Sequence, residues 1–249
     1  MMETSNRRLT ARSVLASTLL GSDPPELPVA HLVELSSLFG INANRARVAL
    51  SRMVASGEVT TDGAGRYRLS GHLLDRQRRQ NASRAGRTRR WQGDWQVVVV
   101  TTTGSTAEVR NHRRSALSFA RLAELRDGVW LRPDNLDVEL PDDLGPDITR
   151  LSARPDDPSE LVGRLWPTAE WAERARRLGH QLAASPPHDW TDLEPGFVLS
   201  ASVLRHFQAD PLLPSELLPA DWPGERLRAV YDEWDTSYRE ILAAWTPSA

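Results

Sequence analysis

The chain has 249 residues, no cysteine and a formal net charge of −2. This length suits two or three small domains, and the lack of cysteine excludes disulfides, thiolate nucleophiles and cysteine-ligated zinc. No segment is long and apolar enough to span a membrane, and the run Val14–Leu20 is interrupted by Ser17 and Thr18, so it is a poor signal peptide. We therefore expect a cytoplasmic protein.

The charge is divided unevenly along the chain. Residues 1–90 contain fifteen Arg and seven Asp or Glu, a net charge of +8, whereas residues 91–249 contain sixteen Arg and twenty-six acidic residues, a net charge of −10. A basic module concentrates near a polyanion while an acidic remainder stays away from it. All the cationic residues are Arg, which makes bidentate contacts to guanine edges.

The first sixty residues predict three helices. The first two cover Thr10–Leu20 and Val29–Phe39, and a glycine follows each. Prolines in the segment between them prevent that segment from being helical. A third helix follows Ile41 and ends at Gly57, where a left-handed conformation carries no side-chain penalty.

The third helix has an arginine-rich outer side. Ala46, Leu50 and Met53 recur at helical spacing and are expected to point inward. The opposite side and its flank carry polar residues, namely Asn44, Arg45, Arg47, Ser51 and Arg52. On a helix taken alone, such a face is a solvated surface as often as a binding surface.

A hairpin is predicted directly after this helix. Val59–Thr61 and Arg66–Leu69 flank a glycine-rich turn. Three helices and a hairpin predict a winged helix-turn-helix, a motif whose recognition helix enters the major groove of DNA. The candidate DNA-binding residues are therefore the polar ones of the third helix, with Arg66 and Arg68 from the wing.

Residues 71–90 link this module to the rest of the chain. Their first half predicts a helix with Leu73, Leu74 and Gln77 inward. Their second half is a basic linker. Its arginines either contact phosphates, which position a protein without reading sequence, or are simply solvated.

The central part of the chain predicts a small mixed domain. Strands are expected at Gln96–Thr102, Gly128–Arg132, Asp137–Leu140 and Ile148–Ala153, with helices at Ala107–Leu125 and Asp157–Trp166. The order β-α-β-β-β-α is close to a ferredoxin-like α+β sandwich.

The last part of the chain is predicted to be helical, with helices at Glu170–Ala184, Pro195–Phe207 and Gly224–Trp245. The segment Asp210–Pro223 alternates leucines with four prolines. We interpret it as a structural cap over the helical domain rather than as a ligand contact, because exposed apolar patches are normally small.

Several motifs carry a resemblance to a known family. They are Arg47 with Ala49-Leu50-Ser51-Arg52-Met53, the junction Trp91-Gln92-Gly93-Asp94-Trp95, Gly128-Val129-Trp130, and Leu165-Trp166. The most specific is Asp210-Pro211-Leu212-Leu213-Pro214, followed by Leu217-Leu218-Pro219-Ala220-Asp221-Trp222-Pro223-Gly224. In these motifs, over nearly its whole length, the chain resembles the PaaX family, repressors of phenylacetate catabolism and their relatives.

The resemblance implies a domain organisation and a function. It implies a winged helix-turn-helix DNA-binding domain at 1–83, a basic linker at 84–92, a ferredoxin-like central domain at 93–167 and a helical C-terminal domain at 168–249. It also implies a homodimer on an inverted-repeat operator of double-stranded DNA, released by an aryl-CoA or related acyl-CoA thioester, phenylacetyl-CoA in the founding group. The chain departs from the family pattern at Thr101–Asn111, which is unusually polar, and at Asn42–Arg45.

A CoA thioester combines anionic phosphates with an apolar acyl end, so its site is expected to place arginine beside aromatic residues. In the central domain the candidate effector-binding residues are Arg113, Arg114, Trp130 and Arg132. The alternative, which the residue types favour, is an ion-paired helix face and a core tryptophan.

Two other functions compete with a ligand-released repressor. One is an activator or adaptor without a small-molecule signal. The other is a metal-dependent nuclease, because the implied central fold resembles that of the small CRISPR-associated endoribonucleases. Such a nuclease needs a carboxylate near the end of the first strand, where this chain has Thr101–Thr103 and no acid until Glu108. The histidines also lack metal-ligand spacing, so we expect no enzyme, catalytic residue, metal or cofactor.

Overall fold

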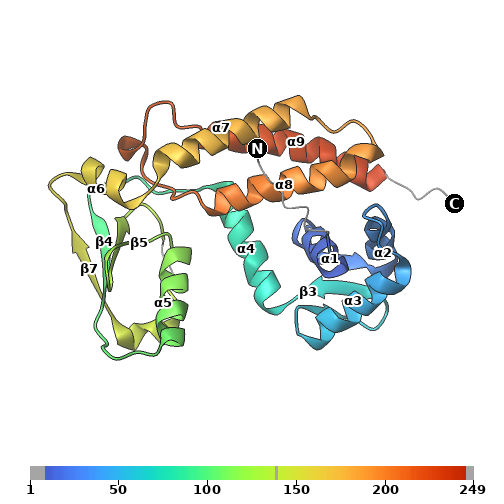
Figure 1. The fold of residues 1–249 in the computed structure, drawn as a ribbon, viewed down its shortest axis with the longest axis horizontal. Coiled ribbons are helices and arrows are strands. Elements are labelled where there is room, and N and C mark those ends of the chain that lie inside the picture. Colours follow the sequence, from blue (N-terminus) through green and yellow to red (C-terminus); the bar gives the residue numbers. More distant parts are fainter. Residues whose placement is uncertain (1–8, 138–139, 245–249) are drawn as a thin grey trace. The chain divides into compact units, whose positions relative to one another are not determined.

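A computed structural model describes residues 9–137 and 140–244 of the chain (Figure 1). Within it the chain forms two compact units. The first comprises the chain up to Arg84, Leu182–Gln208 and the chain from Tyr231, and the second comprises Ala85–Gln181 and Ala209–Val230. The architecture is mixed helix and sheet, with a separate sheet in each unit.

The N-terminal part of the first unit contains the predicted helices and hairpin. Its elements are α1 (Ala11–Leu20), β1 (Glu26–Pro28), α2 (Val29–Ser37), α3 (Ala43–Ala55), β2 (Val59–Thr61), β3 (Arg66–Leu69) and α4 (Gly71–Ala85). The side chain of Thr10 accepts a hydrogen bond from the backbone N–H of Ser13 and so caps α1. Both hairpin strands have the bounds that the sequence predicted.

Strand β1 was not expected from the sequence. It pairs antiparallel with β3, which gives a three-stranded sheet of order β1-β3-β2. Only three residues long and ending in a proline, β1 offers no alternating pattern by which a strand is recognised. Its pairing matters because it places Glu26 opposite Arg68.

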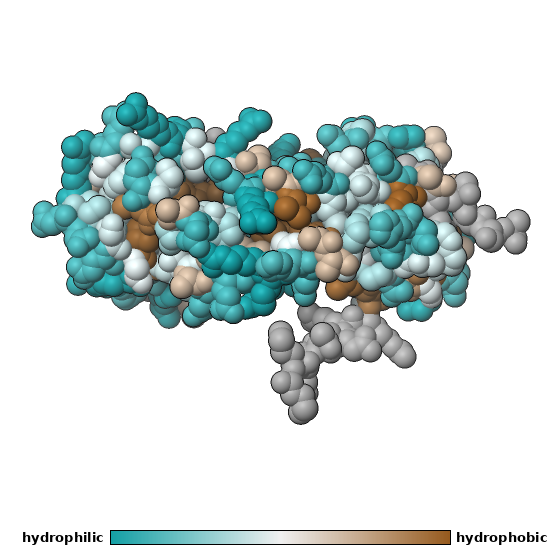
Figure 2. Space-filling view, turned by 90° about the horizontal axis from the view of Figure 1, so that it is seen from above, coloured by the Kyte–Doolittle hydropathy of each residue, from teal (hydrophilic) through white to brown (hydrophobic). Residues whose placement is uncertain are grey.

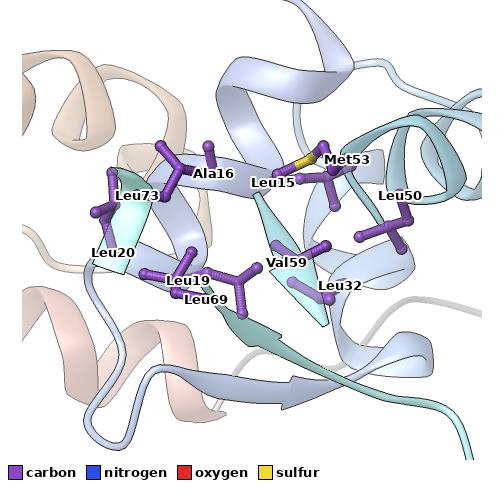
Figure 3. Close-up of a cluster of buried hydrophobic side chains, with 10 residues drawn as sticks. All are labelled: Leu15, Ala16, Leu19, Leu20, Leu32, Leu50, Met53, Val59, Leu69 and Leu73. Carbon is purple, nitrogen blue, oxygen red and sulfur yellow. The ribbon is translucent and has the colours of Figure 1, made fainter. Parts of the chain in front are cut away.

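The core of this part is a cluster of apolar side chains between the helices and the hairpin (Figure 3). Leu15 and Leu19 of α1 meet Leu50 of α3, Val59 of β2 and Leu69 of β3, each of them at most 1% exposed. Burial of each such side chain contributes about 1.5–3 kcal/mol. The core therefore holds α3 by its apolar side and leaves its opposite side to solvent.

Helix α4 is longer than predicted, because it runs to Ala85, into the segment interpreted as a linker. Buried Gln77 donates hydrogen bonds to the carbonyl oxygens of Leu20 and Ser22. Near its end, Arg84 forms ion pairs that extend the ordered helix. The acidic partners lie about 150 residues away in the sequence, which is why local composition suggested a solvated linker.

The second unit contains a four-stranded sheet. Its elements are β4 (Trp95–Val100), α5 (Ala107–Phe119), β5 (Ala123–Arg126), β6 (Val129–Pro133), the 3-10 helix η1 (Asp142–Asp147), β7 (Ile148–Ala153) and α6 (Pro158–Leu165). The strand order is β5-β6-β4-β7, and all neighbouring pairs are antiparallel.

Two expectations for this sheet need correction. The helix predicted to reach Leu125 ends at Phe119, because Arg121 adopts a left-handed φ of 61° and the chain turns into β5. Asp137 and Leu140 are not in a strand, and Val138 and Glu139 lie outside the described residues. The sheet of the described residues includes β5, a strand that was not expected from the sequence.

The two faces of this sheet are covered differently. Val98 and Trp130 pack with Leu117 of α5 on one face. Trp95 and Leu131 pack with Val162 of α6 on the other. Leu213, from the proline-rich connector, joins this second core. The connector was expected to cap the helical domain, and at Leu213 it packs on the central sheet instead.

The remaining elements are helical. They are α7 (Thr168–Ala184), the 3-10 helix η2 (Trp190–Asp192), α8 (Leu193–Gln208), the 3-10 helix η3 (Ser215–Leu217) and α9 (Gly224–Ala244). In the first unit, Gly196 of α8 lies so close to Tyr238 of α9 that an added Cβ would be 2.6 Å from a ring carbon. Phe207 also meets the Tyr231 ring edge-on, with centroids 5.6 Å apart.

Candidate nucleic-acid interface

Helix α3 divides into a buried and an exposed side, as its sequence predicted. Ala46, Leu50 and Met53 are each no more than 1% exposed. The candidate DNA-binding residues of this helix are all exposed, namely Asn44, Arg45, Arg47, Ser51 and Arg52. The helix therefore carries a mainly polar exposed face, which also includes Val48 at 43% exposure.

The start of α3 is fixed by its cap. The side chain of Asn42 accepts a hydrogen bond of 2.9 Å from the backbone N–H of Arg45. This satisfies one of the unpaired N–H groups of the first turn and defines where the helix begins. Ile41, which directly precedes Asn42, is buried in the core. Asn44 and Arg45 consequently stand on the first exposed turn of the helix.

The arginines of α3 are not neutralised by the protein. Arg45, Arg47 and Arg52 form no ion pair within the part of the chain that the structure describes. About half of the exposed arginines elsewhere in the described chain form an ion pair with a carboxylate, as Arg154 does with Asp94 at 2.6 Å. A guanidinium without a carboxylate partner keeps its full charge and all its donors for an anionic ligand.

The wing arginines are organised differently, because one carboxylate holds both of them. Arg66 Nε donates to Glu26 Oε1 at 2.6 Å, and Arg68 Nε donates to Glu26 Oε2 at 2.7 Å. Hydrogen bonds from Arg66, and then from Arg68, hold the pKa of the Glu26 carboxyl below its usual value. The trio has a net charge of +1 and presents two aligned guanidiniums. Glu26 was missed in the sequence because its role depends on the unexpected strand β1.

A groove runs beside the exposed face of α3. It has a volume of about 680 Å³ and lies between the N-terminal end of α1 and α3. Its lining includes Arg12, Asn44, Arg45, Val48 and Arg52. The groove thus joins the arginines of α3 to the ion pair of Arg12 and Glu58, which also lines it.

Arg12 is a member of this surface that the sequence did not indicate. Its Nε donates to Glu58 Oε2 at 2.9 Å. The hydrogen bond from Arg12 outweighs burial and keeps the pKa of the Glu58 carboxyl below its ordinary value. The two residues are 46 positions apart, and no local pattern relates them. The contact ties the start of α1 to the residue that precedes β2.

The four candidate effector-binding residues do not converge on one site. Arg113 is buried and contacts Asp147 at 3.1 Å. Arg114 lies over the ring of Trp130 with its guanidinium carbon 5.9 Å from the centroid, and pairs with Glu124. Arg132 is fully buried and donates to backbone carbonyls and to Asn135. Of the four, only Arg114 and Trp130 are in contact, and an effector role stays a prediction.

Among the described residues, no three His, Asp or Glu side chains lie close enough together to bind a metal ion. Nor does any helix in residues 9–137 and 140–244 have the length and hydropathy needed to cross a bilayer.

This arrangement defines a multidomain protein with a basic N-terminal helix-and-hairpin module, a central sheet domain and C-terminal helices. Family models match each part: "PaaX-like protein" at residues 10–73, "PaaX protein central Cas2-like domain" at 88–145 and "PaaX-like protein C-terminal domain" at 166–246. The chain therefore belongs to the PaaX family, as its motifs indicated, and this membership suggests a transcriptional regulator.

One solved structure extends the comparison over nearly the whole chain. It is the uncharacterized protein Rv0674 from Mycobacterium tuberculosis, which is 44% identical in sequence with a TM-score of 0.77. The alignment covers 95% of this chain and 98% of that one. Comparison with curated proteins gives no match.

Proposed function

We propose that the chain is a DNA-binding transcriptional repressor that reads a double-stranded operator through a winged helix-turn-helix made of α1–α3 and β1–β3. The observation that carries this proposal is the row of exposed arginines on α3 without carboxylate partners in the described chain. A helix with this face, capped at its start and followed by a hairpin, has the form of a recognition helix and its wing.

The proposed domain organisation is the winged helix at 1–83, a linker at 84–92, a ferredoxin-like central domain at 93–167 and a helical domain at 168–249. The strand order β5-β6-β4-β7 supports the ferredoxin-like assignment, because the two central strands are the first and third of the sheet along the chain.

The candidate residues of the interface are assigned to different parts of the DNA duplex according to their position. Arg47 and Arg52, at the middle of α3, are assigned to base edges in the major groove, where Arg makes bidentate contacts to guanine. Ser51, next to Arg52, is assigned to a base or a phosphate, and Asn44 and Arg45 are assigned to contacts at the start of the helix. Arg66 and Arg68 of the wing are assigned to phosphates, which position the protein on the duplex.

The protein would act as a homodimer on an inverted repeat, with half-sites about one helical turn apart or a multiple of it. An acyl-CoA thioester would release it from DNA. Such a ligand acts only if it binds the DNA-free geometry more tightly than the DNA-bound one.

The direct test is binding of the full chain to DNA. Fragments enriched from random duplexes would be measured by fluorescence anisotropy at several salt concentrations, with unrelated duplex as competitor. We expect one sequence to be preferred at least a thousandfold over competitor, with affinity falling steeply as salt rises. Equal affinity for every duplex, or none, would contradict the proposal.

Two further measurements test the regulatory part. A thermal-shift panel of acyl-CoA thioesters should contain a compound that raises the melting temperature, because a ligand of the folded state stabilises it. In vitro transcription from a promoter carrying the enriched sequence should then fall on adding protein and recover on adding that compound. A rise on adding protein would identify an activator instead.

A further inference from the structure

Val48 is an apolar residue on the exposed face of α3. It is 43% exposed, and it is the only exposed large apolar residue between Leu9 and Ala85, a stretch that the structure describes in full. A single exposed valine is ordinary on a protein surface. Figure 2 shows hydrophobic residues in separate patches among hydrophilic ones on the face in view. The position of Val48 on α3, rather than its exposure alone, is what calls for an explanation.

Val48 lies at the centre of the candidate DNA-binding residues of α3. Asn44 and Arg45 precede it by four and three residues, and Ser51 and Arg52 follow it by three and four. Residues at these intervals are neighbours on a helix surface. All four are exposed, and Arg45 and Arg52 line the same groove as Val48. A duplex that docks on this face therefore covers Val48.

The fold does not require a valine at this position. The two apolar cores around α3 lie within the described residues and take up Ala46, Leu50 and Met53, and Val48 belongs to neither core. Valine also has a lower helix propensity than alanine, because its branched side chain loses χ1 freedom in a helix. Neither packing nor helix formation favours valine here, and its side chain is free to contact a ligand.

The major groove of DNA presents one apolar group, the C5-methyl of thymine, among hydrogen-bond donors and acceptors. The side chain of Val48 has no donor or acceptor, so a polar base edge facing it would lose water without gaining a hydrogen bond. A thymine methyl has no such cost, and its contact with Val48 removes two apolar surfaces from water. Thymine is therefore the base that suits this position best.

The neighbouring arginine limits where this thymine lies. An α-helix rises about 1.5 Å per residue, so Arg52 is about 6 Å from Val48 along the helix axis. Successive base pairs are about 3.4 Å apart. The thymine should therefore lie within about two base pairs of the guanine that Arg52 is proposed to contact.

We propose that Val48 is a specificity-determining residue that packs against the C5-methyl group of a thymine in the operator. This inference deepens the proposed function and rests on it. It adds to the arginine contacts one base, one chemical group on that base and the side chain that reads it.

The test removes the methyl group from the DNA. Each thymine of the duplex preferred by the full chain would be replaced in turn by deoxyuridine, which lacks the C5-methyl but keeps every hydrogen-bonding group of thymine. Fluorescence anisotropy would measure the dissociation constant of each duplex. We expect one replacement in each half-site to raise this constant roughly fourfold, the factor that corresponds to one buried methyl group, and the others to change it by less than about twofold.

A variant shows whether Val48 is the side chain in contact. Val48→Ala puts a better helix former at an exposed position, so its melting temperature should match that of wild type. It should bind the thymine duplex more weakly by at least a similar factor, and it should no longer distinguish thymine from deoxyuridine at the sensitive position. Val109→Ala, which removes a 42% exposed valine of α5, is the matched control and should keep the full sensitivity.

Sequence-specific binding in which no thymine is sensitive to loss of its methyl group would overturn the role of Val48 and leave the proposed function standing. Sensitivity that persists unchanged in Val48→Ala would assign the methyl contact to another side chain, and the inference would fail in that case too. A chain that prefers no duplex would contradict the proposed function itself, and this inference with it.

Discussion

Arg132 donates a hydrogen bond of 3.2 Å from Nη2 to the carbonyl oxygen of Leu212, although the two residues are eighty positions apart. Leu212 has a left-handed φ of 49°, which costs about 1–3 kcal/mol in a residue with a side chain. Arg132 also donates to the carbonyl of Arg121, whose φ is 61°. One buried guanidinium thus fixes two strained turns.

The function of this contact is structural, because Arg132 joins the central sheet to the proline-rich connector. Asn135 donates to the same carbonyl of Leu212 at 2.8 Å, and both side chains are fully buried. The motif at 210–214 thus forms a backbone turn that Arg132 and Asn135 hold through the carbonyl of Leu212.

We predict that Arg132→Met destabilises the protein. The substitution puts an apolar side chain in place of the guanidinium and leaves the carbonyl of Arg121 without this donor, and the cost of each such buried group is about 1–3 kcal/mol. Urea unfolding should show a loss of about 2–4 kcal/mol. Arg126→Met, at an exposed position on β5, is the control and should lie within about 0.5 kcal/mol of wild type.

We predict that Arg47→Ala and Arg52→Ala each weaken binding to the preferred duplex by about 1–3 kcal/mol, because each removes a base contact. Binding to unrelated duplex should change much less. Anisotropy titrations of both duplexes measure this difference. Arg174→Ala, which removes an exposed arginine of α7, is the matched control. Both α3 variants binding as tightly as this control would contradict the assignment.

We predict that Glu26→Gln tightens binding to DNA and steepens its salt dependence. The carboxylate neutralises part of the charge of Arg66 and Arg68. Its removal leaves one more positive charge facing the phosphates, so the slope of log affinity against log salt should grow by about one. Glu34→Gln on α2 is the control, since Glu34 is exposed and has no arginine partner in the described chain. A slope that rises equally in both variants would argue against a role for the wing.

We predict that Glu58 makes stability sensitive to acid. Its pKa in the folded state lies below the ordinary value of 4.5, first because of the hydrogen bond from Arg12. The stabilisation is therefore complete above about pH 4.5 and is lost as the pH falls through the folded-state pKa. Urea unfolding at pH 7 should separate Glu58→Gln from wild type, and the gap should narrow as the pH falls below 4.5. A constant gap across this range would show that another group is responsible.

The sequence predicted α3 and the hairpin well, because a local pattern defines each of them. The buried and exposed sides of α3 follow from residue spacing alone, and the hairpin follows from its glycine turn. Two of the missed features depend on partners far away in the chain, whereas β5 was missed although it pairs with the next strand, β6. Strand β1 forms by pairing with β3. Arg132 was a candidate effector-binding residue but is buried, and its guanidinium donates to the carbonyl of Leu212.

The end of α4 also depends on partners far away in the chain. Arg84 donates to both Asp232 and Asp235 of α9, each at 2.7 Å. Asp235 also accepts a hydrogen bond from Arg239 at 2.8 Å, and its side chain is 6% exposed, whereas that of Asp232 is 56% exposed. The two carboxylates therefore share a donor but differ in burial.

We predict that Asp235→Ala lowers the free energy of unfolding by about 3 kcal/mol, because it leaves the guanidinium of Arg84 partly buried without its enclosed partner. Asp232→Ala should cost no more than about 0.5–1 kcal/mol, because solvent already screens that pair. Urea unfolding of the two variants measures the contrast. Equal losses would mean that burial does not set the strength of this contact and that α4 is held to α9 by its apolar surface instead.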